Sequence, residues 1–395
     1  MWLLLFKLGY LLAVFLAVRS WPALDSEVFE RVHQHWPRQG GPVFATHFAT
    51  WDTAHYLYLS EVGYSAGVPS CAFYPLWPLL IRASAVCTGG NHLVSGLILA
   101  NLFSLAAWWL FYFLVCERFG EGAATMALLF LLVFPGSLFF QFAYSESLFF
   151  LLLMLLWLGL ETERPLVLLC CAFLLPMTRA IGVFCVVPVA WHFLRAPCAS
   201  LYKSWRKPSQ GSCLFGRAAA PARFASVLRE SLRASPFILM PLMGWGVYFI
   251  LMDVWTGNPF EGMQAQRFWG VQSIHNIFDL PKFISSYFSP TAFHELSGSL
   301  LDRIVFTGVC YTVPLVWKLG KDMFLWLLVL AFLPALSGDL ASFTRFCAVA
   351  FPVFTALGWY GSRAPRKWLA LGYFGICGPL HLVLLWRFVN YHWAG

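Results

Sequence analysis

The chain has 395 residues, of which 60% are hydrophobic and only 11% are charged. A soluble domain of this length has too little interior to hide so many apolar side chains, so the composition excludes an ordinary soluble protein and indicates a bilayer as solvent. The formal net charge of +8 does not indicate nucleic-acid binding, because the basic residues lie mostly in short loops between apolar runs, a pattern that is typical of membrane orientation.

The apolar runs predict an all-α, polytopic integral membrane protein with about eleven transmembrane helices in one domain, residues 1–395. The first run has the length of a signal peptide, but it lacks a basic start and a small-residue cleavage site, so we interpret it as an uncleaved span. Residues 166–194 also fit one long, broken helix. The predicted spans are 2–18, 93–115, 123–142, 147–160, 166–175, 181–194, 236–252, 304–316, 323–336, 346–360 and 368–386.

With the N-terminus inside, most Lys and Arg residues of the loops fall on the cytoplasmic side, as the positive-inside rule requires. Residues 196–235 are then a basic, mobile cytoplasmic loop, which either touches anionic lipid headgroups or only sets the topology. Residues 19–92 and 253–303 are the two long external segments. Both are rich in aromatic residues and proline, so we expect short amphipathic or re-entrant helices in them.

The first external segment contains Trp51-Asp52 followed by His55-Tyr56. In a helix, Asp52 would lie near the start, where a carboxylate accepts a backbone N–H, and His55 and Tyr56 would share its face. Gly63 would end this helix. The same residues also fit a helix cap within an interfacial aromatic belt.

Tyr74 is followed by two prolines three residues apart, which predict a broken helix near lipid. Arg82 lies just beyond them and either binds a phosphate or extends to the headgroups. Cys71 and Cys87 in this segment either form a disulfide or stay free, and no cysteine spacing indicates a metal site.

Further candidates lie at the predicted outer mouths of the spans. Glu146 follows Tyr144 between two apolar runs, where a carboxylate is costly, so it is either functional or paired with an arginine such as Arg179. Arg345 begins a later span, and its planar guanidinium suits a phosphate. The second external segment adds Gln266, Arg267 and Trp269.

These motifs together resemble the PIG-V family, the second mannosyltransferase of GPI-anchor assembly and its prokaryotic relatives. The resembling residues are spread over most of the chain, and they are the WD-x-x-HY motif at 51–56, Gly63-Tyr64, the segment 73–78, the AYSE motif at 143–146, 178–182, and Arg345 with Phe351-Pro352. Tyr74 and Trp77 stand where the family pattern often has Phe and Tyr, which favours a prokaryotic relative and places a GPI acceptor in doubt.

The resemblance implies a GT-C fold and inverting transfer of mannose from polyprenyl- or dolichyl-phosphate mannose to an acceptor hydroxyl. Asp52 matches the family's loop carboxylate, and the resemblance thus implies that it is the general base. His55 and Glu146 are the other catalytic candidates. The substrate-binding candidates are Trp51, Tyr56, Tyr74, Arg82, Tyr144, Arg179, Gln266, Arg267, Trp269 and Arg345.

The site would face the non-cytoplasmic side of a prokaryotic inner membrane or a eukaryotic endoplasmic reticulum membrane. We expect no cofactor and no metal, since no phosphate-binding glycine loop or DxD pair is visible outside. The expected partners are membrane lipids, the lipid-linked donor and a glycan, glycolipid or protein acceptor. A small membrane subunit is left open. The alternatives are a transporter or flippase of a lipid-linked or anionic substrate, and a noncatalytic scaffold.

Overall fold

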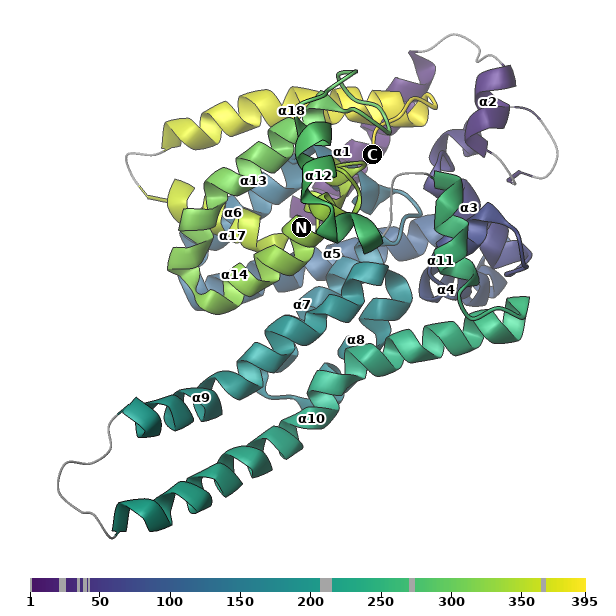
Figure 1. Cartoon of the computed structure of the whole chain (residues 1–395). Coiled ribbons are helices and arrows are strands. Elements are labelled where there is room, and N and C mark those ends of the chain that lie inside the picture. The colour runs from purple at the N-terminus through teal and green to yellow at the C-terminus, as the bar shows by residue number, and fades with distance from the viewer. Residues whose placement is uncertain are drawn as a thin grey trace.

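The computed structural model describes residues 2–20, 26–33, 36–37, 41, 43–206, 215–269, 274–363 and 367–395. Within these ranges every element of regular secondary structure is a helix, apart from an isolated β-bridge between Ala292 and Ser299. The chain is therefore an all-α protein, and Figure 1 shows helices packed around a central group with α5, α7 and α17.

The N-terminal part consists of one long apolar helix and a series of short ones, which confirms the short helices predicted for residues 19–92. They are α1 (Trp2–Arg19), α2 (Ser26–His33), η1 (Phe44–Phe48), α3 (Asp52–Glu61), η2 (Pro69–Ala72), α4 (Leu76–Ala85) and η3 (Val86–Thr88). The predicted break at Pro75 and Pro78 is wrong, because both prolines stand at the start of α4, where a helix does not need their missing N–H groups.

The middle of the chain supplies most of the buried core. Its helices are α5 (His92–Phe119), α6 (Glu121–Val133), η4 (Pro135–Gln141), α7 (Glu146–Thr162), α8 (Pro165–Thr178), η5 (Ala180–Cys185), α9 (Val186–Arg206) and α10 (Phe215–Thr256). Apolar residues surround α7 on nearly every face, so it lies inside the helix group and packs against α5 and α8.

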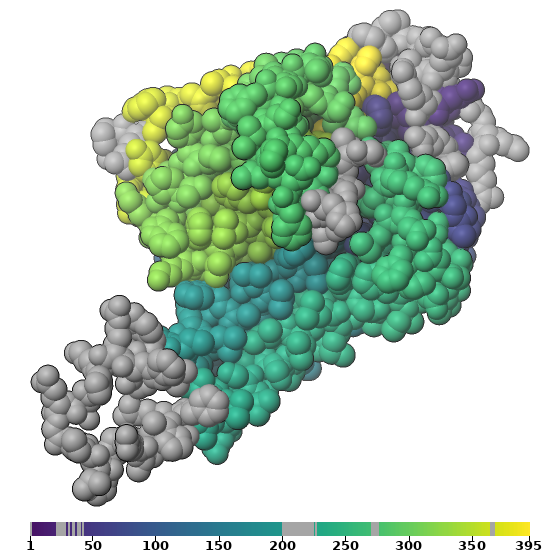
Figure 2. All heavy atoms as spheres, in the orientation of Figure 1, coloured from purple at the N-terminus to yellow at the C-terminus, as the bar shows by residue number. Residues whose placement is uncertain are grey.

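The remaining helices complete the body around this core. They are α11 (Glu261–Ala265), η6 (Gln266–Trp269), η7 (Ile274–Phe278), α12 (Leu280–Tyr287), α13 (Leu300–Leu319), α14 (Lys321–Leu327), η8 (Leu328–Phe332), α15 (Leu333–Ser337), α16 (Phe343–Cys347), α17 (Phe351–Gly361) and α18 (Lys367–Val389). In Figure 2 the green atoms of α12 and the loop after it lie over the front of this half.

The chain is a multi-pass membrane protein, but the predicted number of about eleven spans is not confirmed. Six helices of the described chain are long and apolar enough to cross a bilayer: α1, α5, residues 180–199, residues 227–256, α13 and residues 368–389. The run 123–142 is not one straight helix, because α6 and η4 meet at Pro135 with a bend of 83°, and this pair makes a seventh crossing if it is counted as one span. Helix α8 has only 14 residues, shorter than a span usually needs.

The basic stretch 196–235 is helical on both sides of residues 207–214, which lie outside the described residues. The prediction of a loop throughout it is therefore wrong, since its Ala, Arg and Leu residues are good helix formers. Helix α10 has 42 residues. At about 1.5 Å per residue it is roughly twice as long as a 30 Å hydrocarbon core is thick. In Figure 1, α9 and the first part of α10 extend together beyond the body.

A buried lysine connects α1 to the core. Lys7 donates to Ser104 Oγ at 2.7 Å and to Gln141 Oε1 at 2.6 Å, and its ammonium lies 4.3 Å from the centre of the Trp108 ring. Because Gln141 ends η4, this contact fixes α1 against the segment that leads to Glu146. Elsewhere, Cys71 is buried and Cys87 is exposed, and both are free thiols, so the disulfide alternative is not realised.

Candidate active site

Asp52 is the first residue of α3, and the backbone before it is strained. Trp51 has a φ of 54°, a left-handed conformation that is rare for a bulky side chain. Two contacts hold it there: its indole Nε1 donates to the His392 carbonyl at 3.2 Å, and its ring lies edge-on to Trp393. Strain of this kind persists where the surroundings over-determine it, and it is common at functional sites.

Asp52 does not cap its helix as expected. Its Oδ2 accepts from Arg345 Nη1 at 2.5 Å, and its own backbone N–H donates to the Tyr144 hydroxyl at 3.2 Å. The side chain is thus turned away from the helix end and toward a distant part of the chain. Gly63 ends the helix as predicted, with a φ of 97° and a bond from its N–H to the Leu59 carbonyl.

Glu146 begins α7 and is only 1% exposed. Its Oε1 lies 2.5 Å from Arg179 Nη1 and 3.1 Å from Arg345 Nε. The ion pair with Arg179, one of the two interpretations of Glu146, is therefore present. The other oxygen, Oε2, has no hydrogen-bond partner among the described residues, so it remains able to accept a hydrogen bond.

Arg345 joins the two carboxylates. It is buried on α16, and its guanidinium lies 5.3 Å from the centre of the Tyr144 ring and 4.9 Å from that of Phe346. Although burial alone would lower it, the charges of Asp52 and Glu146 raise the pKa of Arg345, so the guanidinium stays charged. We call Asp52, Glu146, Arg179 and Arg345 the charge cluster.

Two residues that the sequence did not single out hold Arg345 in place. Asp302 Oδ1 accepts from both the backbone N–H and the hydroxyl of Thr344, each at 2.6 Å. A Cβ on Gly136 would lie 2.1 Å from the Thr344 carbonyl oxygen, so η4 and α16 meet backbone to backbone at this glycine. In the sequence, Asp302 is one of several acidic residues in the segment 253–303, and Gly136 is marked only by the proline before it.

The charge cluster contains two carboxylates and two guanidiniums, so its formal charge is zero. Burying such groups costs several kcal/mol per ion in desolvation, which mutual attraction repays only partly. Burial, together with the negative charge of Glu146, raises the pKa of Tyr56, whose neutral hydroxyl shares a 2.8 Å hydrogen bond with Ser145. Retaining so many charges inside an apolar body favours a functional role over a stabilising one.

Two other predicted site residues, His55 and Trp269, form a separate group with Phe73, which we call the aromatic wall. His55 Nδ1 lies 2.8 Å from Ser70 Oγ, and the ring stacks on Phe73 and meets Trp269 edge-on. Gln266 reinforces this contact by donating to the Ala72 carbonyl at 3.3 Å. The wall thus joins residues 19–92 to residues 253–303, one turn of α3 away from Asp52.

The structure does not bring the remaining candidates to the charge cluster. Tyr74 stacks on Tyr248 of α10, with ring centres 4.4 Å apart. Arg82 and Arg267 are both exposed, and Arg267 lies over its neighbour Phe268. In the described part of the chain, no group of three or more His, Cys, Asp or Glu residues is placed to hold a metal ion.

No protein-family model matches the chain, and no curated protein matches it. Similar solved structures include the oligosaccharyltransferase of Archaeoglobus fulgidus in complex with Zn and sulfate, which is 11% identical with a TM-score of 0.44 over 94% of this chain and 52% of that one. The oligosaccharyltransferase AglB of the same organism, with an inhibitory peptide and a dolichol-phosphate, is 11% identical with a TM-score of 0.43 over 99% and 56%.

ArnT from Cupriavidus metallidurans, bound to undecaprenyl phosphate, is 13% identical with a TM-score of 0.33 over 91% of this chain and 77% of that one. This chain spans about half the length of the two archaeal structures. Likeness at these identities and scores does not identify the activity of this chain.

Proposed function

We propose that the protein is a GT-C-like glycosyltransferase of the PIG-V type, as its motifs imply. It transfers mannose from polyprenyl- or dolichyl-phosphate mannose to an acceptor hydroxyl on the non-cytoplasmic face of the membrane. The observation that supports this most is the contact between Asp52 and Arg345, because a carboxylate that can accept a proton lies beside a guanidinium that can bind a phosphate.

Asp52 takes the proton of the acceptor hydroxyl in this proposal. The hydroxyl oxygen bonds to the anomeric carbon of mannose as the bond from that carbon to the phosphate oxygen breaks, and attack from the opposite face inverts the configuration. A positioned base typically contributes about 10²–10⁴-fold to the rate. The strained turn at Trp51 supports this role by fixing where the carboxylate points.

The bond that breaks leaves its electron pair on the lipid phosphate, which gains one negative charge. Arg345 and Arg179 would stabilise that charge, and fixed charges aimed at a developing anion often contribute more to catalysis than any other effect. In the structure both guanidiniums are engaged by carboxylates. An entering phosphate therefore competes with Asp52 for Arg345, and displacement would free the Asp52 oxygen that accepts the proton.

The aromatic wall would bind the sugar ring and exclude water, since aromatic faces pack against the apolar C–H surfaces of sugars. His55 has a positioning role in this assignment, because its Nδ1 is engaged by Ser70 and its ring contacts both Phe73 and Trp269. Tyr56 links this wall to the cluster, with its ring edge-on to Phe73 and its hydroxyl bound to Ser145.

The test is an assay of the purified full chain with radiolabelled dolichyl- and undecaprenyl-phosphate mannose, using a total membrane lipid and glycan extract as the source of acceptors. We expect labelled product in the wild type and a loss of about 10²–10⁴-fold in Asp52→Asn. Asp253→Asn, which alters an exposed aspartate near the end of α10, is the matched control and should keep full activity.

Full activity in Asp52→Asn would remove Asp52 as the base. Absence of product with both donors, combined with movement of either lipid across a sealed vesicle, would instead support the transporter alternative. Mass spectrometry of the labelled product identifies the acceptor.

A further inference from the structure

A second polar site lies at the turn that precedes Arg345 in the chain. Residues of α12, of the loop before α13 and of the turn after α15 line a half-open pocket of about 360 Å³. Its polar lining residues are Lys282, Ser285, Ser286, Ser297 and Asp339, and we call it the hydroxyl pocket. None of these residues belongs to the charge cluster or to the aromatic wall.

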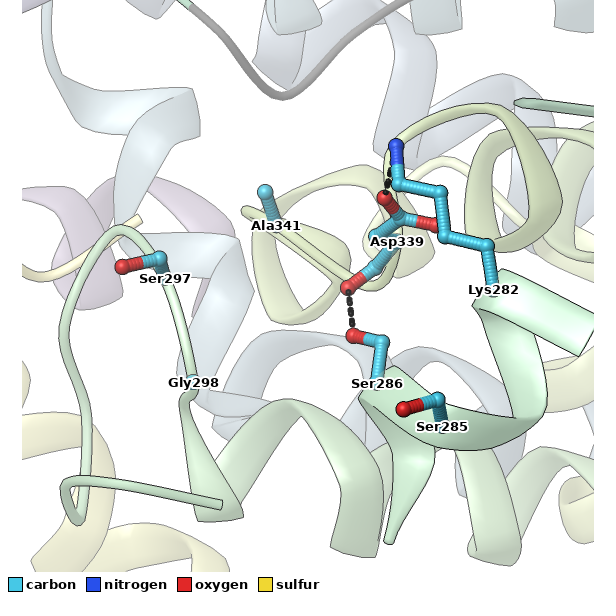
Figure 3. A pocket seen from close by; sticks show the side chains of 7 residues that line it. All are labelled: Lys282, Ser285, Ser286, Ser297, Gly298, Asp339 and Ala341. Atoms are coloured by element: carbon cyan, nitrogen blue, oxygen red, sulfur yellow. Dashed lines mark hydrogen bonds and ion pairs between the residues drawn. The ribbon is translucent and has the colours of Figure 1, made fainter. Parts of the chain in front are cut away.

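The charges in the pocket balance each other. Lys282 Nζ lies 2.8 Å from Asp339 Oδ2, and Figure 3 shows the ammonium beside this carboxylate with the Ser286 hydroxyl donating to the Asp339 carbonyl. The other carboxylate oxygen, Asp339 Oδ1, is buried without a hydrogen-bond partner among the described residues. A buried acceptor of this kind requires an explanation, and a ligand that donates to it supplies one.

This lining selects a neutral ligand that is rich in hydroxyl groups. A hydroxyl donates to the carboxylate oxygen, accepts from the ammonium, and does both with a serine. A phosphate would face the Asp339 carboxylate at close range, and like charges of that kind reject a ligand. A cation would in turn be repelled by the Lys282 ammonium, which lies 2.8 Å from the same carboxylate.

The pocket is connected to the charge cluster through one short and strained turn. Asp339, Leu340 and Ser342 have φ values of 48°, 67° and 58°, and the turn continues through Thr344, which Asp302 holds, to Arg345. Three of the four consecutive residues 339–342 thus have a left-handed backbone without being glycine. Such a conformation persists only where the surrounding structure over-determines it. A ligand in the pocket therefore contacts the element that positions Arg345.

We infer that the hydroxyl pocket binds the acceptor, at a sugar or polyol unit remote from the hydroxyl that reacts. The identification of this ligand as the acceptor rests on the proposed function, whereas the binding of a neutral polyol at Asp339 does not depend on it. Binding energy from a remote part of a substrate accelerates a reaction when it positions the reacting centre.

The experiment measures protection of Ser297→Cys from a maleimide in the otherwise native full chain, with peptide mass spectrometry to separate the sites. The probe is methyl α-mannopyranoside at about 50 mM, well above the roughly millimolar Kd expected of a ligand of its size. Inorganic phosphate at the same concentration is the anionic arm. Two native thiols serve as internal references: exposed Cys87 should label equally throughout, and buried Cys71 should stay unlabelled while the chain is folded.

We expect the mannoside to slow labelling several-fold and phosphate to leave it unchanged. Adding Asp339→Asn should abolish the protection, whereas Glu295→Gln, which alters the ion-paired carboxylate of the loop that carries Ser297, should keep it. No protection by the mannoside, equal protection by phosphate, or protection that survives Asp339→Asn would each overturn the inference. Protection in a chain that transfers no mannose would leave the polyol site standing and refute the proposed function alone.

Discussion

A single methyl group added at Gly136 should disturb the charge cluster, because it would push against the backbone of Thr344, the residue before Arg345. Ala at this position places its Cβ 2.1 Å from the Thr344 carbonyl oxygen, whereas ordinary contacts begin near 3.4 Å. The φ of Gly136 is not in the left-handed region, so the backbone itself accepts Ala and the effect is purely steric. The two nearest atoms are backbone atoms of Thr344, which yield less readily than the end of a side chain, so η4 and α16 must separate.

The required movement is about 1 Å or more, and it falls next to Arg345. Such a shift would lengthen the 2.5 Å contact from Arg345 to Asp52 beyond hydrogen-bond range. Forcing extra volume into a packed core typically costs about 1–3 kcal/mol. A misplacement of about 1 Å can also lower a catalytic rate about 10²-fold. We therefore expect Gly136→Ala to lose both thermal stability and transferase activity.

The assay is the fraction of detergent-solubilised protein that stays monodisperse after heating, followed by mannosyl transfer at a temperature where the variant is folded. Gly122→Ala is the matched control, because its Cβ would meet Ser362 at an ordinary 3.7 Å and Ala favours its helix over Gly by about 1 kcal/mol. A Gly136→Ala protein as stable and as active as the Gly122→Ala protein would refute the backbone contact and the coupling argued from it.

Two further predictions concern the support of Arg345 and the orientation of the chain. Asp302→Leu should destabilise the protein, since each buried donor of Thr344 that is left unpaired costs about 1–3 kcal/mol. Asp302→Asn is the control, because it keeps an amide oxygen that accepts from both donors. Thermal melting in detergent measures the difference in stability between the two variants, and equal losses would contradict the prediction. A membrane-impermeant maleimide should label exposed Cys87 on intact cells and exposed Cys198 only after permeabilisation; the opposite pattern would invert the topology.

Much of the fold could be predicted because apolar content and helix signals are local. The positive φ of Gly63 and the short helices before α5 follow from residues close to each other in sequence. The span count could not be predicted in the same way. Helix α7 is apolar because protein surrounds it, and the run 123–142 bends at Pro135 because packing compensates the break.

The candidate site could be predicted only as a set of residue types. All four residues of the charge cluster were candidates. A single sequence nevertheless does not reveal that Asp52 and Arg345, which are 293 positions apart, are in contact. The support of Arg345 was not predictable, since Asp302 acts through Thr344, 42 positions away. Arg82 and Arg267 have the same side chain as Arg345 and nevertheless lie exposed.

Lys7 has a consequence for how the chain is made. When α1 leaves the ribosome, Ser104 and Gln141, which later receive its ammonium, have not yet been synthesised. A lone lysine raises the free energy of insertion of a nascent helix by up to about 2.5–3.5 kcal/mol, the cost at the helix centre, and each surrounding leucine offsets only a few tenths to about half a kcal/mol. The first helix therefore reaches its most favourable position only after α5 and η4 have emerged from the translocon, so that it docks well after it is synthesised.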